Sequence, residues 1–63
     1  MNKLKAIMAG YGIKQVELSE WLKIPRPIVN SCINRSAFSE EEKNIIFEKL
    51  KDKIPAIKYE DIW

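Results

Sequence analysis

Few residues in this chain could carry out chemistry, and their types and spacing limit what that chemistry could be. The 63 residues include no histidine and one cysteine, Cys32. Zinc sites and Ser-His or Cys-His nucleophile pairs need an imidazole as ligand or base, so the composition argues against them. The run Glu40 to Glu42 could suggest a metal site, but consecutive carboxylates at a helix start point in different directions and are explained by helix capping. The sequence therefore predicts no enzymatic activity, no metal and no cofactor.

Basic residues are concentrated in the first half of the chain. Residues 1–35 contain six Lys or Arg and two Glu, whereas residues 36–63 contain five Lys and seven acidic residues. This asymmetry favours one face that meets a polyanion and another that repels it. An ordinary solvated surface would give the same pattern, so the charge alone leaves both readings open.

The composition predicts one small globular domain over residues 1–63, because 46% of the residues are hydrophobic and 32% are charged. No apolar run approaches the roughly 18 residues needed to span a bilayer, and the N-terminal residues lack the apolar region of a signal peptide. We therefore expect a cytoplasmic protein that does not bind membranes and in which Cys32 stays reduced.

Apolar spacing and capping residues predict the helices that must position any site. Leu4, Ile7, Met8 and Tyr11 share one helical face, which Gly10 and Gly12 then interrupt. Pro27 suits the first turn of a helix, and Ser39 with Glu42 forms a capping box. The tail after Pro55 is compatible with a short strand or with a last helical turn, and we favour the turn. The expected helices cover about residues 2–10, 15–22, 27–34 and 40–54, with the turn at 59–63.

The two helices expected between residues 15 and 34 are joined by three or four residues, the geometry that presents a recognition helix to the DNA major groove. The residues that form this pattern are Gln15, Glu17-Leu18-Ser19, Leu22, Ile24, Val29, Cys32 and Asn34. They resemble the Gln-x-Glu-Leu-Ala-x-x-Leu-Gly-Ile-x-x-x-x-Val/Ile-x-x-x-x-Asn pattern of the Cro/C1-repressor (XRE) helix-turn-helix family. The resemblance is close over these residues and looser over the rest of the chain. It implies an all-α, lambda-repressor-like domain of four to five helices.

The same resemblance implies which residues would touch DNA. Those expected at base edges are Arg26, Pro27, Ile28, Asn30 and Ser31, and those expected at phosphates are Lys14, Gln15, Lys23, Asn34 and Arg35. By side-chain chemistry, Arg26 suits guanine, Asn30 suits adenine, Ser31 suits either base, and Pro27 or Ile28 suits a thymine methyl group. The scaffold residues that would lock the two helices together are Leu18, Leu22, Ile24, Val29 and Cys32, with the small Ser19 allowing close approach.

Lys23 departs from the family pattern, which has glycine at this position. The glycine takes the left-handed backbone conformation of the turn. A non-glycine residue there costs on the order of 1 kcal/mol.

These features together predict a sequence-specific DNA-binding transcriptional regulator, a repressor of phage, prophage or mobile-element type. It would bind double-stranded DNA as a homodimer that is weak or completed only on DNA. Tyr59, Ile62 and Trp63 are candidates for the dimer contact, or else they close the chain's own core. The alternative is a protein-interaction module of the same fold, such as an anti-repressor or an antitoxin, which the acidic second half and the apolar tail suggest.

Overall fold

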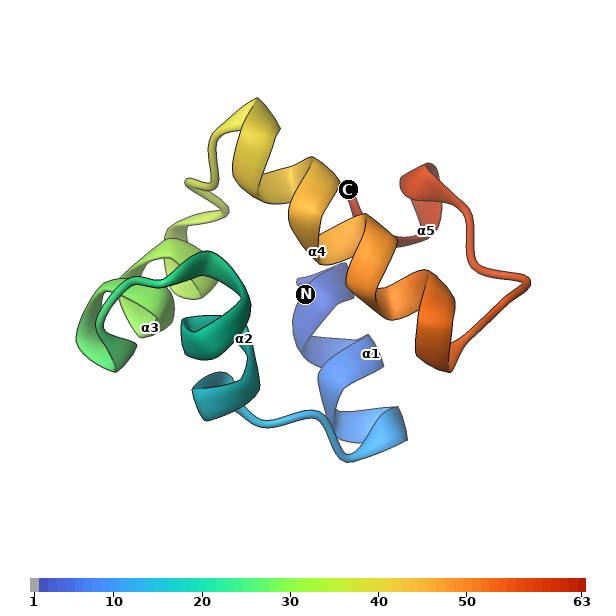
Figure 1. Ribbon diagram of the computed structural model, residues 1–63, viewed down its shortest axis with the longest axis horizontal. Coiled ribbons are helices and arrows are strands. Elements are labelled where there is room, and N and C mark those ends of the chain that lie inside the picture. Colours follow the sequence, from blue (N-terminus) through green and yellow to red (C-terminus); the bar gives the residue numbers. More distant parts are fainter. Residues whose placement is uncertain (1) are drawn as a thin grey trace.

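Helices account for most of residues 2–63, the part of the chain that this computed structural model describes. They are α1 (Lys3–Tyr11), α2 (Gln15–Leu22), α3 (Arg26–Arg35), α4 (Glu40–Lys53) and α5 (Tyr59–Ile62), and Figure 1 shows their arrangement. No strand occurs within residues 2–63, so the prediction of an all-α domain with four to five helices is confirmed. None of the helices formed by these residues combines the length and the apolar character needed to cross a bilayer.

The helices pack so that α3 and α5 lie at opposite ends of the molecule, with α4 running between them (Figure 1). Helix α2 packs against both α3 and α4, and α1 packs against α5. Every helix contributes to one apolar core, and none of the described polar or charged side chains is buried. The buried core residues are Leu4, Met8, Ile13, Leu18, Val29, Ile33, Phe38, Ile46, Leu50, Ile57 and Ile62.

Side-chain caps fix where two of the helices begin. The Asn2 side chain accepts a hydrogen bond from the backbone N–H of Leu4 at 2.9 Å, which satisfies one of the free donors at the start of α1. At the start of α4, the Glu42 backbone N–H donates to Ser39 Oγ at 3.2 Å and the Ser39 N–H donates to Glu42 Oε1 at 2.8 Å. The predicted capping box is therefore confirmed.

The helix expected over about residues 2–10 is confirmed to within one residue at each end, whereas the expected place of Tyr11 was wrong. The helix ends at Tyr11, and Gly12 caps it in the left-handed conformation with φ 68°. Gly10 is tolerated because an isolated helical glycine costs only about 1 kcal/mol. Tyr11 was expected on the inner face, but 60% of its surface is exposed. It is the last residue of the helix, and Met8 is the last residue of α1 that reaches the core.

The tail forms the predicted helical turn, and it closes the core of its own chain. Ile62 is only 2% exposed, so this residue is not available for the dimer contact considered above. The Tyr59 ring meets Phe47 edge-to-face at 5.6 Å between centroids, and the Trp63 ring meets Phe38 in the same way at 5.8 Å. Tyr59 and Trp63 are half-buried in these contacts.

Candidate nucleic-acid interface

The connection between α2 and α3 consists of residues 23–25 and is held by short-range hydrogen bonds. Lys23 caps α2 with φ 57° and ψ 41°, so the predicted left-handed conformation of this residue is confirmed. Its backbone N–H donates to the Ser19 carbonyl, and the Ile24 N–H donates to the same oxygen at 3.3 Å. Ser19 Oγ in turn donates to the Ile24 carbonyl at 2.6 Å. Ser19 therefore fixes the turn as well as allowing the two helices to approach.

The inner faces of the two helices carry the apolar residues that hold them together. Leu18 of α2 and Val29 of α3 are completely buried, as expected for scaffold residues. Leu22, Ile24 and Cys32 are partly buried and pack against the same core. Because these contacts use one side of α3, the opposite side remains open to solvent.

The open side of α3 carries the residues expected at base edges. Arg26, Pro27 and Asn30 are exposed, Ile28 is 50% exposed, and Ser31 is half-buried. The start of α2 and the first two turns of α3 border an open hollow of about 430 Å³, lined by Gln15, Arg26, Pro27 and Asn30. No acidic side chain of the described residues lines it.

A hydrogen bond crosses from α2 to α3 beside this hollow. Gln15 Nε2 donates to Asn30 Oδ1 at 2.9 Å. The contact joins a residue expected at a phosphate to one expected at a base edge. The contact could not be predicted from the sequence, because no pattern within a single helix indicates a side-chain pair fifteen residues apart.

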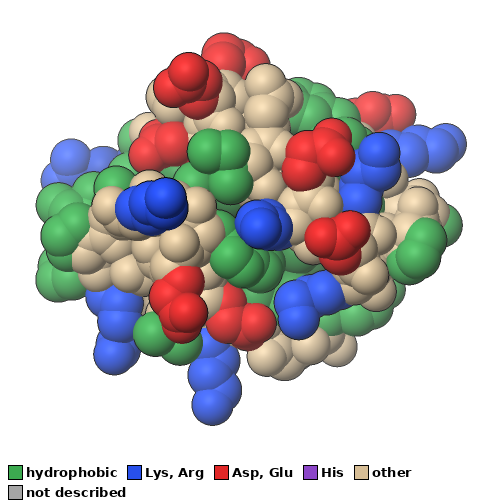
Figure 2. Space-filling model, in the orientation of Figure 1, with side chains coloured by type: hydrophobic (Ala, Val, Ile, Leu, Met, Phe, Trp, Pro, Cys, Tyr) green, Lys and Arg blue, Asp and Glu red, His purple; other side chains and the backbone are tan. Residues whose placement is uncertain are grey.

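The remaining residues expected at phosphates surround the same end of the molecule. Lys14 precedes α2, Lys23 lies between α2 and α3, and Asn34 and Arg35 form the last turn of α3; all four are exposed. The ion pairs formed within residues 2–63 join Lys43 to Glu40 and Lys53 to Glu17, and so use none of these side chains. Figure 2 shows blue, green and red groups at the end where α3 lies, and further red groups over α4. The charged side chains of α3 itself, Arg26 and Arg35, are both basic.

Glu17 is the acidic residue in the first turn of α2, and its carboxylate is already engaged. The Lys14 backbone N–H donates to Glu17 Oε2 at 2.9 Å, and Lys53 Nζ lies 3.6 Å from Glu17 Oε1. The hydrogen bond from Lys14 lowers the pKa of Glu17, and the positive charge of Lys53 acts in the same direction. Pairing with Lys53 also offsets the negative charge that Glu17 brings to this end of the protein.

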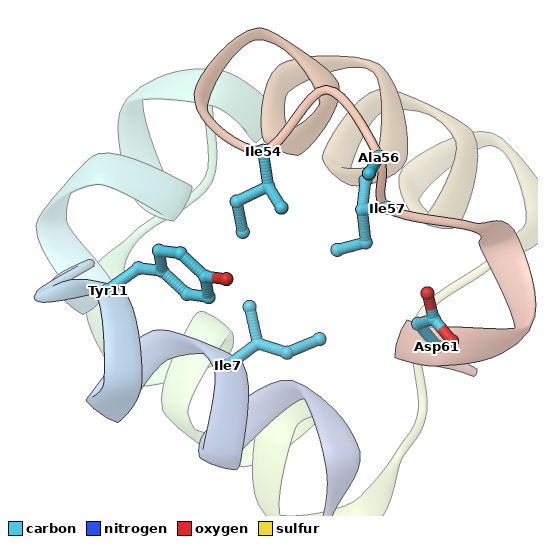
Figure 3. Close-up of a pocket in the computed structure, with 6 residues that line it drawn as sticks. All are labelled: Ile7, Tyr11, Ile54, Ala56, Ile57 and Asp61. Atoms are coloured by element: carbon cyan, nitrogen blue, oxygen red, sulfur yellow. The ribbon is translucent and has the colours of Figure 1, made fainter.

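A second hollow, of about 240 Å³, lies away from α3 between α1 and the connection that leads from α4 to α5. Its lining is mainly apolar, and it consists of Ile7, Tyr11, Ile54, Ala56, Ile57 and Asp61. Figure 3 shows the Tyr11 ring and the isoleucine side chains directed toward its middle, with the Asp61 carboxylate at the side opposite Tyr11. Its aromatic and aliphatic side chains suit this hollow to an apolar group.

Comparison of this chain with known protein families, with curated proteins and with solved structures gives no match. Within residues 2–63, no group of three or more His, Cys, Asp or Glu side chains is placed to hold a metal ion.

Proposed function

We propose that this protein is a sequence-specific DNA-binding transcriptional regulator, a repressor, in which α2, the turn at Lys23 and α3 act as a helix-turn-helix. The observation that carries the proposal is the exposed hollow at the first turns of α2 and α3, which combines Arg26, Asn30 and Gln15 without an acidic neighbour. Side chains of these types donate hydrogen bonds to base edges and to phosphates. We also propose that the protein is cytoplasmic, because its DNA site lies in that compartment.

In this proposal α3 enters the major groove, and its exposed side reads the bases. Arg26 and Asn30 supply the hydrogen bonds, while Pro27 and Ile28 supply apolar contact with thymine methyl groups. Lys14, Gln15, Lys23, Asn34 and Arg35 bind phosphates on both sides of the groove and fix the register of α3. Repression follows from occupancy, because a protein on the operator excludes the polymerase.

Two copies would bind an inverted repeat. Half-sites on one face of DNA lie about 34 Å apart, one helical turn. The molecule measures 29 × 23 × 23 Å, so two copies fit on successive major grooves without overlap. The buried position of Ile62 leaves only half-buried parts of Tyr59 and Trp63 for contact between copies. We therefore expect a weak homodimer that DNA completes.

The proposal is tested by selecting bound sequences from a random DNA pool and then measuring affinity against salt concentration. We expect an inverted repeat and a linear fall of log K with log salt, by about 0.9 for each phosphate contact. Arg26→Ala should cost about 1–3 kcal/mol at one base position, and Lys14→Ala should weaken all sequences alike and reduce the salt slope by about one.

Lys58→Ala is the matched control, because it removes the same charge from the residue before α5, at the end of the molecule away from α3. Its affinity and salt slope should stay close to those of the unchanged protein. Equal retention of every sequence, or an Arg26→Ala variant with unchanged base preference, would contradict the proposal.

The apolar hollow supports a second candidate function, the protein-interaction module. Tyr11 at its edge is 60% exposed, which is unusual for an aromatic ring in a chain whose other aromatic side chains are at least partly buried. This function would be favoured over the first if the protein selected no sequence from the random DNA pool but captured a partner protein. The Tyr11→Ser variant should then fail to capture that partner.

A further inference from the structure

The hydrogen bond between Gln15 and Asn30 bears on which base the protein reads. We propose that Gln15 is a positioning residue, which turns the Asn30 amide so that Asn30 reads guanine and not the adenine that an unrestrained asparagine suits. The inference rests on the proposed function, because it names the base class recognised at the same site.

The geometry of the amide carries the argument. Gln15 Nε2 donates to Asn30 Oδ1 at 2.9 Å, so the oxygen of the Asn30 amide faces α2. An amide is planar, with its nitrogen on the other arm, and therefore Asn30 Nδ2 points away from Gln15. Nδ2 carries two N–H donors, and within residues 2–63 it has no hydrogen-bond partner. Asn30 is itself exposed, so these donors are free to meet a ligand.

The neighbouring reader has the same hydrogen-bonding character. Arg26 lines the same hollow and offers five N–H donors but no acceptor. Pro27, between them in the lining, has neither a side-chain donor nor an acceptor. Among the reading side chains of the hollow, the one acceptor is the Asn30 oxygen, which is turned toward Gln15, and the other polar groups are donors.

Base edges in the major groove distinguish these cases. Guanine presents two acceptors, N7 and O6, whereas adenine presents one acceptor and the N6 donor. A bidentate contact with adenine uses both arms of the asparagine amide, and Gln15 competes for the oxygen arm. A pair of donors is instead complementary to guanine, so the half-site should contain guanine opposite Asn30 as well as opposite Arg26.

The test compares the affinities of the full chain for operators that differ at one base pair. Asn30→Ala first identifies the position, as the one at which base preference disappears. There we expect the unchanged protein to prefer guanine over adenine by roughly fivefold or more. Gln15→Leu releases the Asn30 oxygen and should reduce this preference to less than about twofold. Gln15→Glu replaces the donor by an acceptor for Nδ2, turns the oxygen outward, and should shift the preference to adenine or cytosine, whose amino groups donate.

Lys14→Ala is the control for general loss of phosphate binding, since it lowers affinity for all sequences and should leave the ranking of bases intact. Thermal unfolding of each variant checks the fold. Substitutions of Gln15 should not disturb it, because Gln15 is half-exposed and is the first residue of α2. Selection of adenine by the unchanged protein, or a guanine preference that survives Gln15→Leu, overturns the inference while leaving sequence-specific binding in place. A protein whose base preferences are all unchanged by Asn30→Ala also overturns the inference. Loss of the proposed function looks different, because then no position of the DNA shows a preferred base.

Discussion

Replacing Lys23 by glycine separates the effect of this residue on stability from the phosphate contact that we propose for it. Lys23 has φ 57°, where the Cβ of an L-residue comes too close to the following carbonyl oxygen. This conformation costs roughly 1–2 kcal/mol, which glycine avoids. Glycine loses more chain entropy on folding, by roughly 0.5–1 kcal/mol. The central values of these two ranges, about 1.5 and about 0.75 kcal/mol, leave an expected net gain in the free energy of unfolding for Lys23→Gly of about 0.5–1 kcal/mol.

Lys23→Ala is the matched control, because it removes the same charge but keeps the Cβ atom. Its free energy of unfolding should stay within about 0.5 kcal/mol of that of the unchanged protein. In thermal unfolding followed by circular dichroism, 1 kcal/mol corresponds to a shift of about 4–8 °C for a domain of this size, so Lys23→Gly should melt roughly 2–8 °C higher. Equal melting temperatures for the two variants would refute the argument from backbone strain.

The same two variants test the role of the Lys23 charge. If Lys23 binds a phosphate, both should lose affinity for DNA equally and reduce the salt slope by about 0.9. Glycine would then give a more stable protein that binds DNA less well. Unchanged affinity in both variants would show that the ammonium group lies away from the phosphates.

Three further substitutions test the fold. Gly10→Ala should raise the free energy of unfolding by roughly 0.5–1 kcal/mol in urea denaturation, because Gly10 lies in α1 and an added Cβ would meet no atom within 4 Å; a destabilised variant would contradict the open surroundings. Leu18→Ala should cost about 2–5 kcal/mol in the same measurement, because Leu18 is completely buried between α2 and its neighbours; a cost under 1 kcal/mol would show that the core rearranges freely. Glu17→Gln should flatten the dependence of stability on acid pH. The Lys14 hydrogen bond lowers the pKa of Glu17 in the folded state. The contribution of the ionised Glu17 to the free energy of unfolding is therefore complete well above the ordinary pKa of about 4.3, and it is lost as pH falls through the lowered value. Parallel acid unfolding curves for Glu17→Gln and the unchanged protein would contradict it.

Those parts of the fold that depend on neighbours in the sequence could be predicted from it. The capping box of Ser39 and Glu42 lies within four residues, and the spacing of Leu18 and Leu22 depends on one helical turn. Ile13 and Phe38 were missed as core residues, although both are buried. They stand alone in connections between helices, where apolar periodicity gives no signal.

The candidate site was predictable in its membership but not in its internal contacts. Arg26 is exposed at the first position of α3, and Asn30 lies beside the buried stripe that Val29 and Ile33 form. The hydrogen bond from Gln15 to Asn30 depends on the angle between α2 and α3, which helix packing sets and which a linear pattern does not encode. The burial of Ile62 is a similar case, because it depends on how α5 meets α1.

The contact between α1 and α5 also constrains how the chain folds as it is made. Leu4 and Ile62 are buried in one core, and Lys3 Nζ donates to the Glu60 carbonyl at 3.1 Å. While residue 62 is still inside the ribosome, the apolar side of α1 has no α5 to cover it, even though α2, α3 and α4 have emerged. Helices α2 and α3 thus leave the ribosome before the core that supports them can close. Completion of the native fold must then follow synthesis of α5, and a released chain that ends at residue 55 should remain sensitive to proteases.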